Sequence, residues 1–326
     1  MQLWYDNLDR NIYYRGVFLK DTRQLTETAL LLLVFILLFA VTFFLPLLGT
    51  LLVWFLPFPF IMNAVRNGRN ATVAMVVGAL ILSLFFSVAA LPIAWTFASA
   101  GFVIGEMFRR NKPQFHILLA GSLTYIANFV LLYILLVVVT GTNPIADSID
   151  AMKSMFKDMQ TMSGLPALDE EQMKILFAQL DLVTYLVPSM LIMAGLLFAL
   201  LTQLISGFIL KRLQYDVTKW KPFSEWSFPR SLILYYLIVL ILSLVGLEEG
   251  STLFVLVANL DVLLGNAMVL QGFTVIFAFS KMKQWSTAVP VLITVVSFLL
   301  MFPLQFVKLL GILDLGLNLR SRMNVK

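Results

Sequence analysis

The sequence contains no cysteine and a single histidine, His116, among its 326 residues. The lack of cysteine excludes disulfides, thiolate metal sites, covalent haem attachment and cysteine nucleophiles. A zinc or di-iron site needs several histidines or a carboxylate cluster, so we expect no metal and no cofactor. The sequence also lacks a GxxxxGK[ST] loop, an HExxH motif and a GxSxG elbow with a downstream histidine. We therefore expect that the protein is not an enzyme.

Charge is scarce as well. Charged residues make up 13% of the chain and hydrophobic residues 60%, and the mean hydropathy is +0.92. A soluble domain carries roughly 25% charged residues, so this composition indicates a polytopic membrane protein whose main partner is the lipid bilayer. In such a protein the net charge of +5 reports orientation and contact with anionic headgroups, and we expect no nucleic-acid partner.

Long apolar runs supply the predicted spans. A hydrocarbon layer of ~30 Å needs about 20 residues of α-helix. The predicted fold class is therefore all-α, a polytopic transmembrane helical bundle with about eight or nine spans and two external amphipathic helices. The runs are Thr28–Leu45, Leu48–Val65, Ala71–Ala89, Leu91–Phe108, Phe115–Thr140, Leu182–Leu210, Ser231–Leu247, Thr252–Ser280 and Thr287–Leu317.

Basic residues orient these spans. With the N-terminus inside, the cytoplasmic segments hold most of the Lys and Arg, as the positive-inside rule requires. The outer segments before Gly250 hold only Lys153, Lys157 and Lys174. We expect a multi-pass protein of the bacterial cytoplasmic membrane with a cytoplasmic N-terminus.

The C-terminal tail breaks this pattern. An odd number of full crossings would leave Arg320, Arg322 and Lys326 outside, against the rule. Either the region after Pro303 folds back into the membrane, or one of the apolar runs is not a full crossing.

The chain divides accordingly into consecutive segments. Residues 1–24 form a cytoplasmic or interfacial N-terminal segment, and residues 25–140 hold the first five transmembrane helices. Residues 141–181 form an external helical excursion, and residues 182–319 hold transmembrane helices six to eight with the C-terminal apolar region. Residues 320–326 form a basic tail.

The external excursion reads as two amphipathic helices. Asn143-Pro144 is typical of a helix start, Gly164 and Pro166 of a break, and Asp169-Glu170-Glu171 of a second start, where acids suit the helix dipole. The plain interpretation places both helices on the outer membrane surface. The alternative is a lid over an outward-facing cavity.

The cytoplasmic loop Lys211–Arg230 mixes aromatic and basic residues. This composition favours the headgroup layer, so an interfacial anchor is the plain interpretation and docking of a partner protein is the alternative. The aromatic residues are Trp220, Phe223, Trp226 and Phe228.

Polar residues at membrane depth are the candidate site. Asp261 lies about a third of the way along the run Thr252–Ser280, near mid-depth, where a carboxylate costs ~2.5–3.5 kcal/mol on insertion scales. It shares a helix side with Gly265, Met268 and Gly272. The alternative is a protonated or hydrogen-bonded structural acid.

Three asparagines accompany it. Asn128 lies near mid-depth in its own span, and Asn259 and Asn266 are two turns apart on one side of theirs. The alternative for all three is ordinary hydrogen bonding between helices. Glu248 and Glu249 cap the outer ends of two spans, either as solvated turn acids or as the rim of a mouth that attracts cations.

Several stretches resemble the YybS-like family of uncharacterised bacterial membrane proteins over nearly the whole chain. They are Arg23–Leu31 (RQLTETALL), Trp54–Met62 (WFLPFPFIM), Ala120–Asn128 (AGSLTYIAN), Asn143-Pro144, Phe223–Leu232 (FSEWSFPRSL), Gly246–Ser251 (GLEEGS) and Leu310–Arg322 (LGILDLGLNLRSR).

That family is distantly similar to the substrate-binding components of energy-coupling-factor transporters. The resemblance implies a helical bundle with an outward-opening small-molecule site and an ATPase-linked transporter component as partner. The small-residue motif expected in the first span is absent, since Ala29 has no small residue four positions on. Family genes also neighbour one for a membrane-bound cyclic-di-AMP phosphodiesterase, which implies a regulatory partner.

Two functions follow from these features. The first is a transporter-like bundle that binds a small molecule or cation in an outward-facing intramembrane cavity. Its predicted ligand-binding residues are Asp261, Asn259, Asn266, Asn128, Glu248 and Glu249. The second is a non-transporting membrane scaffold or regulator, whose basic-aromatic loop and C-terminal tail dock a cytoplasmic or membrane partner protein.

Overall fold

The computed structural model describes residues 2–162 and 169–322, and the predicted break at Gly164 and Pro166 lies outside them. All regular elements in these two ranges are helices, so the all-α fold class is confirmed. The longer helices are α1 (Gln2–Phe44), α2 (Pro46–Leu52), α3 (Phe58–Ser83), α4 (Ala90–Arg109), α5 (Gln114–Thr140), α6 (Pro144–Met162), α7 (Glu170–Val183), α8 (Val187–Arg212), α9 (Ser231–Leu244), α10 (Thr252–Met282), α11 (Ala288–Leu300) and α12 (Phe302–Leu317). Three short 3₁₀ turns, η1 (Val53–Phe55), η2 (Thr184–Leu186) and η3 (Phe223–Glu225), and a last turn α13 (Leu319–Arg322) complete the described chain.

Six helical stretches in the described residues are long and apolar enough to cross a membrane. They are Thr22–Phe44, Pro46–Ser83, Ala90–Arg109, Gln114–Thr140, Glu170–Arg212 and Thr252–Met282. The apolar helices α9 and α11 have only 14 and 13 residues, short of the ~20 that a full crossing needs. The polytopic bundle is thus confirmed, while the count of about eight or nine spans stays a prediction.

The stretch Pro46–Ser83 contains a chain reversal. Gly68 has φ 83° and ψ −175°, which is not helical. Asn63 Nδ2 donates to Thr72 Oγ1 at 3.3 Å although the residues are nine apart, and a continuous helix would separate them by about 13 Å. The reversal lies in the loop that the sequence predicts between Val65 and Ala71, and glycine suits its positive φ.

Both helices predicted in the external excursion are present. Asn143 Oδ1 accepts hydrogen bonds from the backbone N–H of Ile145 and Ala146 at the start of α6. Asp169 forms a capping box with Gln172 at the start of α7. The predicted helix starts are therefore confirmed, and their place on the outer surface stays a prediction.

The chain folds into two compact units. The first comprises Met1–Gly141 and Ala194–Trp220, and the second comprises Thr142–Met193 and Lys221–Lys326. Helix α8 contributes to both, so the units do not follow the linear division expected from the sequence.

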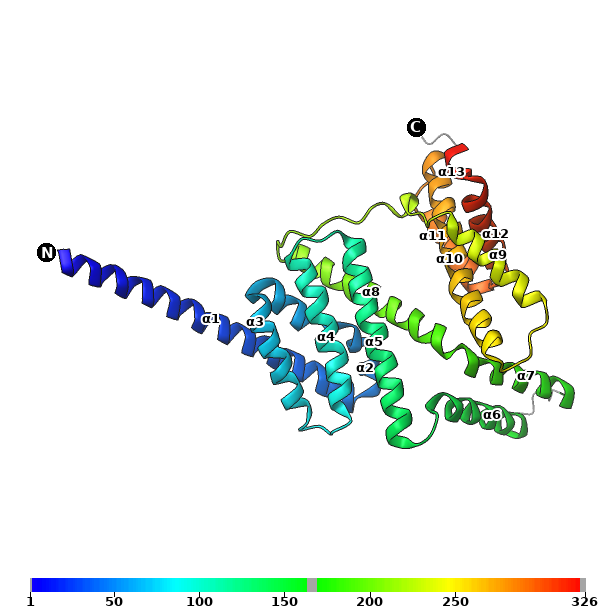
Figure 1. Cartoon of the computed structure of the whole chain (residues 1–326), viewed down its shortest axis with the longest axis horizontal. Coiled ribbons are helices and arrows are strands. Elements are labelled where there is room, and N and C mark those ends of the chain that lie inside the picture. The colour runs from blue at the N-terminus through cyan, green and yellow to red at the C-terminus, as the bar shows by residue number, and fades with distance from the viewer. Residues whose placement is uncertain (1, 163–168, 323–326) are drawn as a thin grey trace. The chain divides into compact units, whose positions relative to one another are not determined.

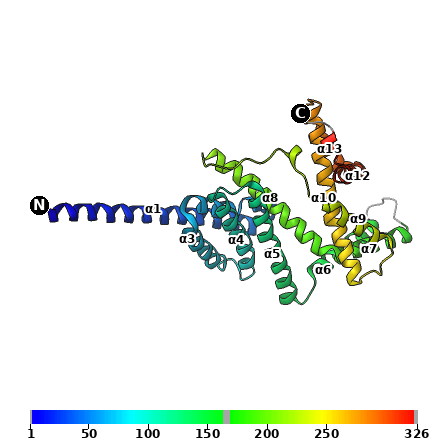
Figure 2. The same ribbon diagram turned by 45° about the horizontal axis from the view of Figure 1, so that its top comes forward.

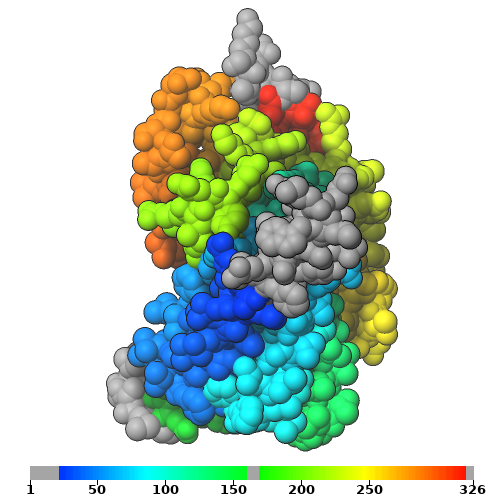
Figure 3. All heavy atoms as spheres, turned by 90° about the vertical axis from the view of Figure 1, so that its left-hand side faces the viewer, coloured from blue at the N-terminus to red at the C-terminus, as the bar shows by residue number. Residues whose placement is uncertain are grey.

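In the first unit, α1, α3, α4 and α5 pack around a core of buried aromatic and aliphatic side chains. Helices α3 and α4 lie side by side (Figure 1), and Figure 3 shows residues of α1 (dark blue) among those of α2 to α4 (lighter blue to cyan). A Cβ at Gly101 would lie 2.5 Å from the Pro57 carbonyl oxygen, and one at Gly105 would lie 2.7 Å from the α-carbon of Ile61. The Gly101–Gly105 pair therefore brings two helix backbones together, as small residues do in membrane proteins.

In the second unit, α10 and α12 run side by side in both Figure 1 and Figure 2. Helix α11 runs back along α10, with Phe298 stacked on Phe273, and the chain reverses at Met301, whose φ is 53°. Helix α12 then runs in the same direction as α10. Its far end reaches the Lys221–Arg230 segment, where Arg320 Nη1 donates to the carbonyl oxygens of Ser224 and Trp226.

The hairpin formed by α11 and α12 favours one of the two explanations for the basic tail, namely that the region after Pro303 folds back. Helix α11 leaves one end of α10, and α12 returns to that same end. The start of the tail therefore lies beside the Lys221–Arg230 segment and not at the opposite end of α10. The positive-inside rule then has no exception at Arg320.

A labelling experiment tests this topology. The natural chain has no cysteine, so single cysteines can be labelled without background. Cysteines at Ser227 and at Ser321 are expected to react with an impermeant maleimide from the same side of the membrane, and one at Glu249 from the opposite side. Labelling of the Ser321 and Glu249 variants from one common side would contradict the hairpin.

Candidate functional site

Helix α10 carries the predicted site. Its N-cap is Ser251, whose Oγ accepts the Phe254 N–H. It meets the Lys221–Arg230 segment at Gln271, whose Oε1 accepts the Phe228 N–H. The nineteen helical steps from Thr252 to Gln271 span about 28 Å, close to a ~30 Å hydrocarbon layer. Asp261 lies about halfway between these two points along α10, and its depth in a membrane stays a prediction.

The predicted side of α10 faces α12 at Gly265, Met268 and Gly272. A Cβ at Gly272 would lie 1.9 Å from the Val307 carbonyl oxygen. A Cβ at Gly311 of α12 would lie 1.9 Å from the Met268 carbonyl oxygen. The two backbones cross in direct contact, and only glycine permits this at both positions.

Lys308 fills the space at Gly265, one turn from Asp261. Its Nζ lies 3.0 Å from where a Gly265 Cβ would be and 5.0 Å from the centroid of the Tyr236 ring. Tyr236 is 1% exposed, so the ammonium group rests on a buried aromatic face, an attractive arrangement when desolvated.

One carboxylate oxygen of Asp261, Oδ1, is buried without a hydrogen-bond partner. The residue as a whole is half-buried. Within the described chain, Asp261 and Lys308 form no ion pair with each other. Two opposite charges therefore lie near each other in the apolar part of the unit without joining.

The side-chain amide of Asn259 has hydrogen-bond partners within the protein on both its oxygen and its nitrogen. Its Oδ1 accepts the Ser189 N–H at 2.7 Å, and its Nδ2 donates to the carbonyl oxygens of Tyr185 and Val255 at 2.7 Å. The side chain therefore caps the start of α8. This is the structural alternative, hydrogen bonding between helices.

Asn128 and Asn266 do not join Asp261 either. Asn128 is 7% exposed and donates to Ser99 Oγ at 2.8 Å, which links α5 to α4 in the first unit. Asn266 is exposed and donates to the Val262 carbonyl of its own helix. Asn266 therefore contacts neither Asp261 nor Asn259 through a hydrogen bond in the described structure.

Glu248 and Glu249 are exposed in the turn before α10. Neither forms an ion pair with another described residue. They fit the plain interpretation of solvated turn acids, and a role at a mouth stays a prediction.

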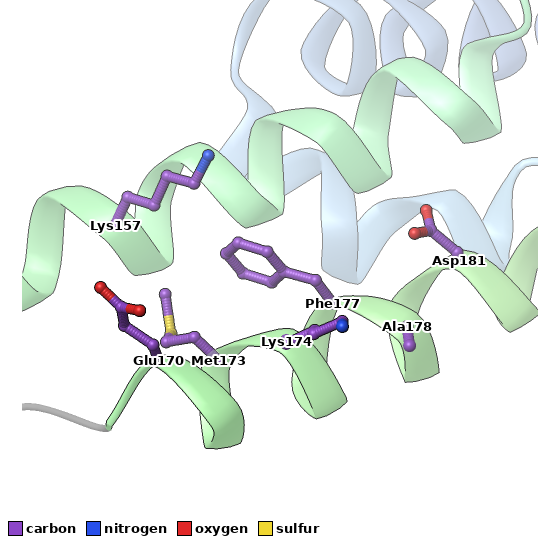
Figure 4. Close-up of a pocket in the computed structure, with 7 residues that line it drawn as sticks. All are labelled: Lys157, Glu170, Met173, Lys174, Phe177, Ala178 and Asp181. Carbon is purple, nitrogen blue, oxygen red and sulfur yellow. The ribbon is translucent and has the colours of Figure 1, made fainter.

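An open hollow of about 560 Å³ lies between α6 and α7 (Figure 4). Phe177 extends from α7 toward α6, and Lys157 Nζ lies 5.4 Å from its ring centroid. Lys153 of α6 pairs with Asp181 of α7. Asp261 is not among the residues that line this hollow, so the lid hypothesis gains no contact from it.

Sequence reasoning missed a buried polar cluster at the other end of α10. Asp314, 4% exposed, accepts hydrogen bonds from Gln271 Nε2 at 2.6 Å and Arg320 Nε at 2.9 Å. The available signal was an acid within the apolar run Thr287–Leu317, followed six residues later by an arginine.

The aromatic residues of the Lys211–Arg230 loop pack inward against the protein. Phe223 contacts the Phe277 ring edge-on at 5.1 Å, Phe228 packs on the Tyr236 cluster, and Trp220 packs on the core of the first unit. The lysines of the loop are exposed, so its exposed surface is more basic than aromatic.

Comparisons with known proteins agree with the membrane assignment. A family model described as "Predicted membrane protein (DUF2232)" matches residues 33–315. The chain is 31% identical over 311 residues to a protein of Bacillus subtilis (strain 168) named "Uncharacterized protein YybS", covering 94% of this chain and all of that relative. No solved structure matches the chain. The resemblance to YybS-like proteins is therefore confirmed, and the chain belongs to the DUF2232 family of predicted membrane proteins.

Proposed function

We propose that this multi-pass membrane protein binds a small polar molecule within the second unit, as a transporter or a transporter component. The ligand contacts Asp261 at the middle of α10. The supporting observation is the buried Asp261 Oδ1 without a hydrogen-bond partner. An intramembrane acid is costly, and it is retained where it faces a partner or a ligand.

The geometry narrows the set of predicted binding residues. Asn259 has all of its hydrogen-bonding groups engaged at the start of α8, and Asn128 belongs to the first unit. The ligand site of this proposal therefore consists of Asp261 and the α12 residues facing it, with Glu248 and Glu249 as the turn at the outer end of α10.

Asp261→Asn is expected to abolish ligand-induced stabilisation. Loss of one charge-assisted hydrogen bond weakens binding by roughly 10- to 100-fold, since such bonds contribute ~1.5–3 kcal/mol. The measurement is the shift in thermal unfolding of detergent-purified protein with the ultrafiltered low-mass fraction of yeast extract as probe.

The control is Asp147→Asn, because Asp147 is an exposed acid in the first turn of α6. It should keep the full shift. If the Asp261→Asn protein is stabilised as strongly as the natural one, Asp261 is a structural acid and the binding proposal is wrong.

A second candidate function is a scaffold for a membrane-bound cyclic-di-AMP phosphodiesterase. One observation favours it: Arg320 holds the start of the C-terminal tail against Ser224 and Trp226, so tail and loop form one surface. Loss of phosphodiesterase co-purification in Trp220→Ala/Trp226→Ala, together with unchanged behaviour of Asp261→Asn, would favour the scaffold.

A further inference from the structure

We propose that the ligand of the Asp261 site is a zwitterion, a free α-amino acid with an apolar side chain, and that Lys308 is its second charged contact. This inference rests on the proposed function and names the ligand class for the same site. Asp261 would receive the ammonium group of the ligand, and Lys308 would donate to its carboxylate.

The first step is the position of the two charges. Gly265 follows Asp261 by one helical turn, so the Cβ positions of this pair are ~5–6 Å apart. Lys308 Nζ occupies the space where the Gly265 side chain would be, at 3.0 Å. Glycine at 265 is therefore what admits the lysine of α12 to the neighbourhood of the acid.

The second step is the charge that a ligand of this site must carry. A ligand that carried only a positive charge would be attracted by Asp261 and repelled by Lys308, and in a low-dielectric interior both forces are strong. A ligand that carried only a negative charge would be attracted by Lys308 and repelled by Asp261. A molecule with both charges in close succession satisfies both groups.

The third step is the unused bonding capacity. Asp261 Oδ1 is buried and accepts no hydrogen bond. The Lys308 ammonium group, which carries three N–H donors, lies over the Tyr236 ring at 5.0 Å and forms no ion pair with another described residue. One α-amino acid supplies a donor group for the first residue and an acceptor group for the second.

The fourth step is the apolar surroundings. Tyr236, Met268 and Leu315 are at most 3% exposed and form one cluster, with Leu264 and Ile312 packed against it. Polar ligand side chains would lose hydrogen bonds to water here without replacement. An aliphatic side chain such as that of leucine matches this environment.

Three probes with the same hydrocarbon side chain and different charged groups test the inference: L-leucine, 3-methylbutylamine, which lacks the carboxylate, and 4-methylpentanoate, which lacks the ammonium group. The natural protein in detergent should be stabilised against thermal unfolding by leucine and by neither analogue. Lys308→Gln should weaken leucine binding at least tenfold, as should Asp261→Asn. Lys283→Gln is the matched control, because Lys283 also lies over an aromatic ring, that of Phe279, at 5.8 Å.

The outcomes separate this inference from the proposed function. Equal stabilisation by the amine and by leucine would overturn the zwitterion and leave a cation site at Asp261. Stabilisation by yeast extract that depends on Asp261, with no response to leucine, would overturn the inference alone. Unchanged leucine binding in Lys308→Gln would remove Lys308 from the site. The comparison of probes on the natural protein needs no variant, so it holds even if Lys308→Gln does not fold.

Discussion

Gly272→Ala is expected to force α12 away from α10 and to cause a large loss of stability. The added Cβ would lie 1.9 Å from the Val307 carbonyl oxygen and 2.8 Å from its carbonyl carbon. These are backbone atoms, so no side-chain rotation relieves the overlap. Overpacking in a well-packed interior costs about 1–3 kcal/mol and occasionally more, and we expect a value at or above the top of this range.

Thermal unfolding in detergent and limited proteolysis of the C-terminal region measure this effect. The matched control is Gly207→Ala in α8, because the atoms nearest to a Cβ there are 3.8 and 3.9 Å away. The free energy of unfolding of that variant should lie within about 0.5 kcal/mol of that of the natural protein, as for tolerated substitutions. If both variants melt alike, α10 and α12 do not cross in direct contact.

The same substitution reports on function. Lys308 lies on α12, and its Nζ reaches the space at Gly265, one turn from Asp261, because α12 crosses α10 closely. A displaced α12 would take the ammonium group away from Gly265, so Gly272→Ala should lose ligand-induced stabilisation together with intrinsic stability.

Arg320→Met is expected to produce the other large effect. The Asp314 side chain is 3% exposed and the Arg320 side chain 16%. Removal of the guanidinium group leaves a buried carboxylate without its cation, which costs about 3–5 kcal/mol. It also removes the donor to the Ser224 and Trp226 carbonyls, so the Lys221–Arg230 segment should become more sensitive to proteases.

Two further variants make this prediction specific. Arg23→Met removes an arginine that is 76% exposed and paired with Glu27 four residues away, and exposed pairs contribute only ~0.2–1 kcal/mol. The double variant Arg320→Met/Asp314→Leu should recover part of the loss, because no unpaired charge remains in the interior. Equal melting of Arg320→Met and Arg23→Met would show that the Asp314 pair adds no more than a surface pair does.

Several features were predictable because they depend on local sequence alone. Apolar run length gave α1, α4, α5, α8 and α10, and Asn143 and Asp169 marked helix starts through their capping side chains. The Glu106 ion pairs with Arg109 and Arg110 also depend on local sequence, since residues three and four apart face each other on a helix.

The candidate site was predictable only in part. The helix period placed Asp261, Gly265, Met268 and Gly272 on one side of α10, and the three later residues of that side meet α12 in the structure. The same period also grouped Asn259 with Asn266, yet one caps α8 and the other is exposed. Periodicity says which residues share a side and not which neighbour meets that side.

By itself, the sequence determined that this is an all-α membrane protein with an acid near the middle of an apolar helix. Hydrophobicity and helical period are properties of short segments, and they need no knowledge of distant contacts. Only the tertiary structure decided that α11 and α12 form a hairpin, that Lys308 stands beside Gly265, and that Arg320 joins Asp314 to the basic loop. These pairings depend on two glycines that let backbones touch across roughly forty residues of chain, and close contact between distant segments leaves no periodic signal in either one.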